Sequence, residues 1–290
     1  MKLITWNIQW CRGCDGRVDP RRIVEHARAL ADFDVLCLQE VADNFPDLKG
    51  SHGENQFQEL TRLLPGFEPI PGIAVDVPDG AGGRRRFGNL VLSRLPVLRV
   101  LRHQLPWPPA AARPGMPRLL IEAVVESQLG RLRVMTTHLE YYSAAHRAAQ
   151  VGAIRRIHEQ SCAHARRDLQ RSATQGAKSK SSSGPFQPLP QPATASLTGD
   201  FSFRPADVLH QQLQTPLDAR TPALLDSWQI AHPGIGHQHT NGVHDREQWP
   251  KPHTCDFIYV TDDLRARVRH VVVDAQTQAS DHQPMLIELG

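Results

Sequence analysis

The stretch "DVLCLQE", residues 34–40, is a near-continuous apolar run that ends in a carboxylate. Its length is typical of a β-strand, and a strand without polar alternation is buried on both faces. Such a strand carries its last side chain to the edge of a sheet, where loops can form a cleft. We therefore expect an α/β protein in which Glu40 faces a site.

The rest of the chain alternates between patterns typical of strands and of helices. Asp19 and Pro20 are a favourable N-cap and first helical position, and apolar residues at helical spacing follow them. Further helices are expected at 57–64, 144–165 and 206–213. Strands are expected at 1–8, 89–93, 97–104, 119–125, 131–137, 195–199, 254–260, 268–275 and 285–289.

Composition places the chain among ordinary globular proteins. It has 290 residues, of which 40% are hydrophobic and 22% charged, enough for one large domain or two modest ones. The net charge of +3 suits an anionic substrate but does not require one. We expect no signal peptide, and no transmembrane segment because no apolar run reaches the roughly 18 residues that a membrane span needs.

Five cysteines, an odd number without a secretory signal, argue for reduced thiols in the cytoplasm. Cys11 and Cys14 form a single CxxC. A zinc site would need two more ligands, and a thioredoxin-like motif would begin a helix, so free loop cysteines are the favoured interpretation. A redox protein is the weaker alternative, and it predicts a reactive thiol of low pKa.

Residues 171–195, "RSATQGAKSKSSSGPFQPLPQPATA", interrupt the pattern of strands and helices. They are rich in Ser, Pro, Gln and Lys, and they cannot bury enough apolar area to offset the entropy of ordering. We interpret them as a flexible surface insertion between a helix and the next strand rather than as a domain boundary.

Polar side chains recur at the ends of the expected strands. Each has an ordinary explanation by itself, such as a turn residue after glycine or a solvated histidine. Their joint appearance points to function, because a β-rich scaffold presents catalytic loops where its strands end. The residues are Asn7, Glu40, His138, Asp200, Asp256, Asp281 and His282.

These residue types suit one kind of chemistry. Carboxylates and an amide are hard oxygen ligands, which favour Mg²⁺ or Mn²⁺ over zinc. Such an ion offsets charge on a phosphate, and histidines can contact phosphate oxygens or move a proton near neutral pH. A separate aspartate can fix the tautomer of such a histidine. The set would suffice to hydrolyse a phosphoester.

Seven motifs occur in the order seen in the endonuclease/exonuclease/phosphatase family, which the chain resembles from Met1 to about Leu289. They are "TWNIQW", "LCLQE", "GNLVLSRLPV", "TTHLE", "GDFS", "CDFIYV" and "SDH". The resemblance implies a DNase-like α/β (α+β) four-layer sandwich, in which two mixed β-sheets pack face to face between flanking helices. It also implies one domain, 1–290, once the insertion 171–195 is discounted.

The resemblance assigns a metal-binding role to three of the polar residues. Glu40 would be the principal ligand of Mg²⁺ or Mn²⁺, and Asn7 and Asp281 would contribute to metal or phosphate coordination.

The catalytic roles that the resemblance implies fall on the other four. Asp200 would orient or deprotonate the attacking water. His138 and His282 would contact the phosphoryl oxygens, and Asp256 would orient His282. The implied reaction is in-line attack on phosphorus, with inversion and without a covalent intermediate.

The chain departs from the family at Ser202. The family pattern is "GDxN", whereas this sequence reads "GDFS" at 199–202. Serine is shorter than asparagine and offers one rotatable O–H instead of an amide. A substrate-tuned variant, a weakened enzyme and an inactive descendant are the competing interpretations, and we favour the first because the other polar residues are all present.

Substrate contacts are expected from Ser202 and from three further residues. Arg86 belongs to a run of arginines, 84–86, which could form a basic loop beside the cleft or simply a solvated surface. Asn89 follows in the next strand, and Tyr142 follows the His138 motif. The histidines of the loop 232–244 match no zinc spacing.

The leading hypothesis is a cytoplasmic, monomeric, Mg²⁺-dependent phosphodiesterase that is nuclease-like and acts on a phosphodiester, with nucleic acid as a candidate substrate. One alternative is a phosphatase or phospholipid-headgroup phosphodiesterase of the same fold. The other is a non-catalytic regulator that binds nucleic acid.

Overall fold

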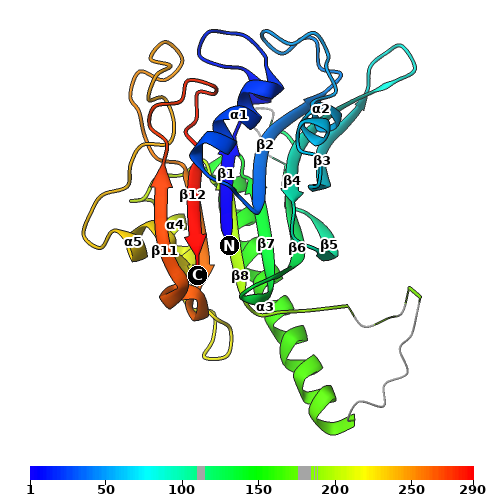
Figure 1. The fold of residues 1–290 in the computed structure, drawn as a ribbon, viewed down its shortest axis with the longest axis vertical. Helices are drawn as coiled ribbons and strands as arrows, with labels where there is room; N and C mark the ends of the chain where they lie inside the picture. The colour runs from blue at the N-terminus through cyan, green and yellow to red at the C-terminus, as the bar shows by residue number, and fades with distance from the viewer. Residues whose placement is uncertain (110–114, 176–183, 186, 188) are drawn as a thin grey trace.

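The computed structural model describes residues 1–109, 115–175, 184, 185, 187 and 189–290 (Figure 1). Within these residues, two six-stranded β-sheets form the centre of the protein. In spatial order, the first consists of β11 (Val268–Val273), β12 (Met285–Leu289), β1 (Lys2–Asn7), β2 (Val35–Asp43), β4 (Arg84–Ser93) and β3 (Glu68–Pro78). The second consists of β5 (Val97–Gln104), β6 (Leu119–Ser127), β7 (Gly130–His138), β8 (Ala195–Asp200), β10 (Asp256–Thr261) and β9 (Leu224–Asp226). Both sheets are mixed, because β1–β2 and β7–β8 are parallel pairs among antiparallel neighbours.

The two sheets pack face to face, and alternate side chains of a strand enter different layers. In β2, Val35 and Cys37 lie in the core between the sheets, together with Ile121 of the second sheet. Leu36 and Leu38 point the other way, into the core beneath the helices. Both faces of β2 are therefore buried, which explains its uninterrupted apolar sequence.

Helices cover the outer face of each sheet (Figure 1). α1 (Pro20–Leu30) and α2 (Gln56–Leu63) pack on the first sheet, and α3 (Ala144–Gln175) and α4 (Val208–Gln214) pack on the second. As expected, Pro20 is the first residue of α1, and the Asp19 side chain accepts a hydrogen bond from the backbone N–H of Arg22. The order helix, sheet, sheet, helix confirms the predicted four-layer sandwich.

The strands β3 and β9 and the helix α5 (Ser227–Ala231) are among the elements that the sequence patterns do not predict, as are the short 3-10 helices Gln9–Cys11 and Asp262–Arg267. β3 contains Pro69, Pro71 and Pro78, which weaken a strand signal, and it lies at the edge of its sheet, where a missing N–H is tolerated. β9 and α5 are too short to show a periodic pattern.

α3 continues well beyond residue 165, where the sequence pattern places its end. Its C-terminal part projects from the rest of the protein (Figure 1). Residues 171–175 of the expected insertion 171–195 thus belong to a helix. Residues 176–183, 186 and 188 of that insertion lie outside the described residues.

The strands carry polar residues from both sheets to one rim of the sandwich. β7 and β8 are parallel and pair His138 with Asp200 at their C-terminal ends. β10 runs antiparallel to β8 and begins at Asp256, opposite Asp200. β1 ends at Asn7, beside Gln39 of its parallel neighbour β2. The ends of parallel strands and the start of an antiparallel neighbour share one edge of a sheet, and this edge forms the site.

Candidate active site

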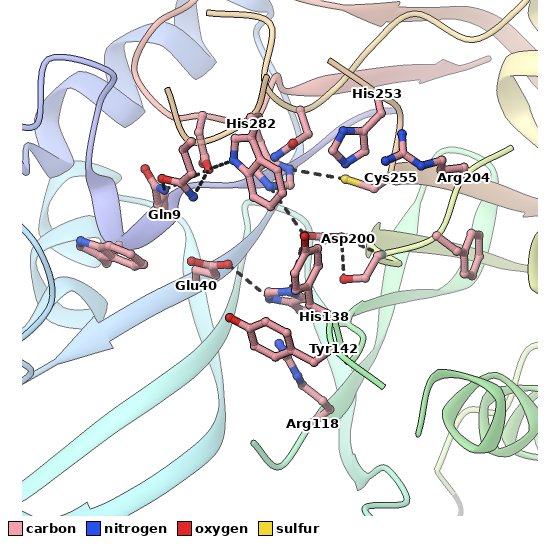
Figure 2. A pocket seen from close by; sticks show the side chains of 18 residues that line it. Gln9, Glu40, Arg118, His138, Tyr142, Asp200, Arg204, His253, Cys255 and His282 are labelled. Atoms are coloured by element: carbon pink, nitrogen blue, oxygen red, sulfur yellow. Dashed lines mark hydrogen bonds and ion pairs between the residues drawn. The ribbon is translucent and has the colours of Figure 1, made fainter. Parts of the chain in front are cut away.

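A cavity of about 490 Å³ opens at this rim (Figure 2). It is lined by Glu40 from the first sheet, by His138 and Asp200 from the second, and by Asp281 and His282 from the loop before β12. The predicted residues Ser202 and Tyr142 also line it, and Asn7 and Asp256 are buried directly behind it. Nine of the eleven predicted site residues therefore come together, and the other two are Arg86 and Asn89.

Glu40 reaches the cavity because β2 contains a β-bulge. Strict alternation would place Glu40 on the same face as Leu38, beneath the helices. The pairing with β4 shifts register between Leu38 and Val41, and Glu40 has a φ of 60°. A left-handed backbone at a residue other than glycine costs of order 1–3 kcal/mol and is typical of functional sites. The bulge re-aims the Glu40 side chain to the rim.

Asn7 holds two carboxylates in place. Its side-chain Nδ2 donates to Glu40 Oε1 and to Asp200 Oδ2, both at 3.0 Å, while its Oδ1 accepts from the backbone N–H of Gln9 at 3.0 Å. The amide oxygen is thus engaged with the backbone, and the amide nitrogen faces the carboxylates. In this arrangement Asn7 links the two carboxylates, and its predicted contribution to metal or phosphate coordination stays a prediction.

His138 lies between two carboxylates and yet remains neutral. Its Nε2 is 3.5 Å from Asp200 Oδ2, and its Nδ1 is 3.8 Å from Glu40 Oε1 (Figure 2). Burial and the neighbouring Arg118 guanidinium lower the pKa of His138 to about 3, although the charge of Asp200 acts in the opposite direction. The neutral imidazole can therefore donate one hydrogen bond and accept another.

His282 has the opposite protonation behaviour. Its Nδ1 lies 2.9 Å from Asp256 Oδ2, and its Nε2 lies 3.8 Å from Asp200 Oδ2. Burial disfavours the charged ring, but the Asp256 carboxylate outweighs this effect and raises the pKa of His282 well above its ordinary value. Asp256 thereby also fixes the ring, so that Nε2 points toward Asp200.

Asp281 is held by several N–H donors. Its Oδ2 accepts from Trp249 Nε1 at 2.8 Å, from Gln9 Nε2 at 2.9 Å and from Gln248 Nε2 at 3.3 Å. Ser280 Oγ donates to its Oδ1 at 3.3 Å. These contacts fix the orientation of the carboxylate in the cavity lining.

The cavity fits a hard divalent cation. Burial and the charge of Asp281 raise the pKa of Glu40 to about 7, which shows that a carboxylate there lacks sufficient positive charge around it. Oxygen donors from Glu40 and Asp281 are the ligands that Mg²⁺ and Mn²⁺ prefer. Asp200, Cys255 and His282 also lie close together, but the Cys255 sulfur is a soft donor, which hard cations such as Mg²⁺ disfavour.

Ser202 supports Asp200 through its backbone. Its N–H donates to Asp200 Oδ1 at 2.8 Å, and its Oγ donates to the carbonyl of Leu139 at 3.3 Å. The residue has a φ of 53°. Asparagine, which the family pattern has here, tolerates this left-handed backbone more readily than most residues.

Several cavity residues escape the sequence patterns. Arg118 directly precedes the apolar strand β6, and a lone arginine at that point gives no functional signal. Tyr141 stacks edge-on against Trp249, with ring centroids 5.7 Å apart, and both line the cavity. Trp249 comes from a loop whose sequence shows no periodicity, so only the fold brings it to the site.

The basic run 84–86 is not a loop beside the cleft. It forms the start of β4, and its three arginines are ion-paired with aspartates. Arg86 lies 3.4 Å from Asp43 and 3.8 Å from Asp76, and it does not line the cavity. Asn89 is buried in the same strand, outside the cavity lining. The ion pairs hold Arg86 and burial encloses Asn89, so neither residue belongs to the cavity lining.

The CxxC pair does not have the character of a redox motif. The five cysteines all lie within the described part of the chain and are free. Burial raises the pKa of both Cys11 and Cys14, whereas a reactive dithiol needs a lowered one.

The sandwich and its rim of carboxylates and histidines define a phosphoesterase with a DNase-like fold. Residues 4–282 match the sequence profile of the Endonuclease/Exonuclease/phosphatase family. Since the match spans nearly the whole sequence, the chain belongs to this family. A comparison with curated proteins found no significant match.

Solved structures agree with this assignment of the fold. An endonuclease/exonuclease/phosphatase from Beutenbergia cavernae DSM 12333 is 24% identical, with a TM-score of 0.65 over 100% of this chain and 72% of that one. One from Bacteroides vulgatus is 20% identical, with a TM-score of 0.66 over 100% and 98%. The mannosyl-6-phosphatase Bt3783 of Bacteroides thetaiotaomicron VPI-5482 is 14% identical, with a TM-score of 0.63 over 100% and 99%. Across the described residues, no helix has the length and apolarity needed to cross a membrane.

Proposed function

We propose that the protein is a divalent-metal-dependent phosphodiesterase that acts by in-line attack of water and is nuclease-like in its substrate class. The observation that carries this proposal is the convergence of Asp200 and two histidines in the cavity that Glu40 also lines, with His138 and His282 ring nitrogens 3.5 and 3.8 Å from Asp200 Oδ2. A carboxylate beside two imidazoles can direct a water toward phosphorus while the imidazoles contact phosphoryl oxygens.

The metal would be held by Glu40 and Asp281, and Mg²⁺ or Mn²⁺ would supply positive charge beside the phosphate. Burial raises the pKa of Asp200, but the charge of His282 and the hydrogen bond from the Asn7 amide act against burial and hold the pKa below its ordinary value, so the carboxylate is ionised and can orient the attacking water. His282, kept cationic by Asp256, would neutralise charge that develops on a phosphoryl oxygen.

The aromatic rim supports a substrate with a planar group. Tyr141, Tyr142 and Trp249 line the cavity, and the two tyrosine side chains are largely exposed. The faces of such rings are surfaces on which a nucleobase can stack. This favours a nucleotide or a single strand over a lipid headgroup.

Arg118 favours a second candidate, a phosphomonoesterase. Its side chain is 7% exposed, and in the described part of the chain its Nε and Nη1 have no hydrogen-bond partner, although Glu140 lies 3.7 Å away. A phosphomonoester carries more negative charge near neutral pH than a diester, and an additional buried cation would stabilise it. The similar fold of a mannosyl-6-phosphatase is compatible with this candidate.

Hydrolysis of bis(p-nitrophenyl) phosphate and of p-nitrophenyl phosphate, with Mg²⁺, with Mn²⁺ and with EDTA, tests the proposal. We expect faster turnover of the diester with either ion, and none with EDTA. Asp200→Asn should remove the activity. Asp47→Asn is the control and should not, because Asp47 is an exposed aspartate that is ion-paired with Arg85 outside the cavity. Turnover in EDTA, or none with any divalent ion, would refute the proposal.

The same assay decides between the two candidates. Two results would together favour the phosphomonoesterase. The wild type would hydrolyse the monoester faster than the diester, and Arg118→Met would lose more activity toward the monoester than toward the diester.

A further inference from the structure

A second cluster of metal-binding residue types lies outside the catalytic cavity. His210 in α4, Asp226 at the end of β9 and His237 in the loop 232–244 meet in the interior. Asp226 Oδ2 lies 2.9 Å from His210 Nε2 and 2.6 Å from His237 Nε2. The three side chains are at most 8% exposed. None of them lines the catalytic cavity.

We propose that His210, Asp226 and His237 bind a transition-metal ion of the Zn²⁺ type. Two imidazole nitrogens and one carboxylate oxygen form a donor set that suits Zn²⁺ and does not suit Mg²⁺. The donor atoms all lie within 4.8 Å of one another. Ligand atoms around a tetrahedral Zn²⁺ are about 3.3 Å apart, so the two Asp226–histidine distances of 2.9 and 2.6 Å need to lengthen by less than about 1 Å.

The backbone and burial prepare Asp226 for this role. Its Oδ1 accepts from the N–H of Trp228 and caps α5, so Oδ2 alone faces the two histidines. The Nε2 atoms of His210 and His237 both contact this single oxygen, which brings the three donor atoms together.

Two hydroxyl groups beside the cluster support an occupant. Tyr259 pairs directly with Asp226 across β9 and β10, and its ring centroid is 5.8 Å from that of His210. Among the described residues, the buried Tyr259 hydroxyl and the buried Ser227 hydroxyl have no hydrogen-bond partner. Buried hydroxyls are rarely left unsatisfied. A water on the fourth position of a three-ligand zinc site would offer such a partner.

The ion would cross-link short segments that have little intrinsic stability. α4 has seven residues, β9 three and α5 five, and the loop 232–244 has little regular structure of its own. Phe203 lines the catalytic cavity and also packs against His210, with ring centroids 6.2 Å apart. Binding would therefore stabilise the wall behind Phe203 without contributing a ligand to the catalytic centre.

Cobalt titration in a variant with an impaired catalytic centre tests this site. Glu40→Gln protein, stripped with EDTA, is titrated with Co²⁺ and followed by visible absorption and by bound metal per chain. We expect one equivalent, with the intense bands of a four-coordinate ion. Adding His237→Gln should abolish them, whereas His244→Gln is a matched control, because His244 contacts the carbonyl of Ala275 instead.

Asp226→Asn provides a second test if His237→Gln fails to fold by circular dichroism. An asparagine still accepts from the Trp228 N–H, so the cap of α5 is kept while the charge is lost. Absence of Co²⁺ binding in Glu40→Gln, or equal absorption bands with and without His237, would overturn the proposal. The three residues would then form only a structural hydrogen-bond network. This experiment measures bound metal and not hydrolysis, so a negative result here would leave the phosphodiesterase proposal untouched.

Discussion

At the scale of the residue, two histidines of one site differ in protonation because they have different neighbours. His282 is hydrogen-bonded to Asp256, whereas His138 lies beside the Arg118 guanidinium. Environments that push two pKa values apart divide acid and base roles between groups of the same type. The site can thus present a neutral and a cationic imidazole at the same pH.

Asp256→Asn should lower kcat by about 10²- to 10⁴-fold, because the support and orientation of His282 are lost. KM should change little, because Asp256 lies behind the cavity and does not line it. The raised pKa of His282 keeps its cation present well above pH 6.5, and without Asp256 the cation is lost at lower pH. The alkaline limb of the pH–kcat profile should therefore move to lower pH. An unchanged alkaline limb would argue against a cationic His282.

Ser202→Asn tests why the chain departs from the family pattern. Since asparagine tolerates the φ of 53°, we expect the melting temperature to change by no more than about 2 °C. We expect kcat/KM to fall at least about tenfold, because a longer side chain enters a cavity shaped around serine. Ser202→Ala controls for loss of the hydroxyl. A large gain in activity would show that serine is a defect rather than an adaptation.

At the scale of the element, the site depends on irregularities in regular strands. The bulge in β2 turns Glu40 to the rim, and Gly199 lets β8 approach β7 closely enough to pair His138 with Asp200. Gly199 has a φ of 137°, and a Cβ there would lie 1.9 Å from the carbonyl oxygen of Thr137. No side chain fits at this position.

Gly199→Ala should therefore destabilise the protein by several kcal/mol, since the two strands must separate or the backbone must shift. Gly152→Ala in α3 is the control, because its Cβ would meet nothing closer than the Arg156 Nη1 at 3.4 Å. Alanine in a helix interior is favoured over glycine by up to about 1 kcal/mol. Urea denaturation should show a large loss for the first variant and none for the second. Equal midpoints would contradict the close approach of β7 and β8.

At the scale of the whole molecule, the candidate catalytic cavity joins the two sheets. Glu40 comes from the first sheet, and His138 and Asp200 come from the second. Without a metal, the Glu40 carboxylate has a pKa of about 7 instead of 4.5, so its ionisation opposes folding. The sign follows from linkage: the penalty is absent below pH 4.5, grows with rising pH and is complete above pH 7.

Glu40→Gln should therefore be more stable than the wild type in EDTA at pH 8, by up to about 3 kcal/mol, and no more stable at pH 4. Added Mg²⁺ should raise the melting temperature of the wild type and leave that of Glu40→Gln unchanged. At a Mg²⁺ concentration of 100 times Kd, binding should increase the free energy of unfolding of the wild type by about 2.7 kcal/mol. Thermal denaturation with EDTA and with Mg²⁺ measures both effects. Equal Mg²⁺ shifts in the two proteins would show that Glu40 is not a ligand.

The sequence by itself indicated the buried strands of this protein and most of the polar residues that meet at its rim. Uninterrupted apolar strands such as β2 require burial on both faces, and polar residues at strand ends require a shared rim, so Glu40, His138 and Asp200 could be selected without coordinates. Ordered motifs added the fold class and the family. The proline-rich edge strand β3 and the short β9 and α5 were beyond reach, because their signals are weak or too short.

Only the tertiary structure decided what each polar atom faces. Asn7 points its amide nitrogen at two carboxylates, Arg86 is held by aspartates in a strand, and Arg118 enters the cavity from a position without any pattern. His210 and His237 meet at Asp226 although they are distant in sequence. Periodicity along a chain reports which side of an element is buried, but hydrogen-bond partners and protonation depend on distances between elements, which are set when the sheets and loops pack together.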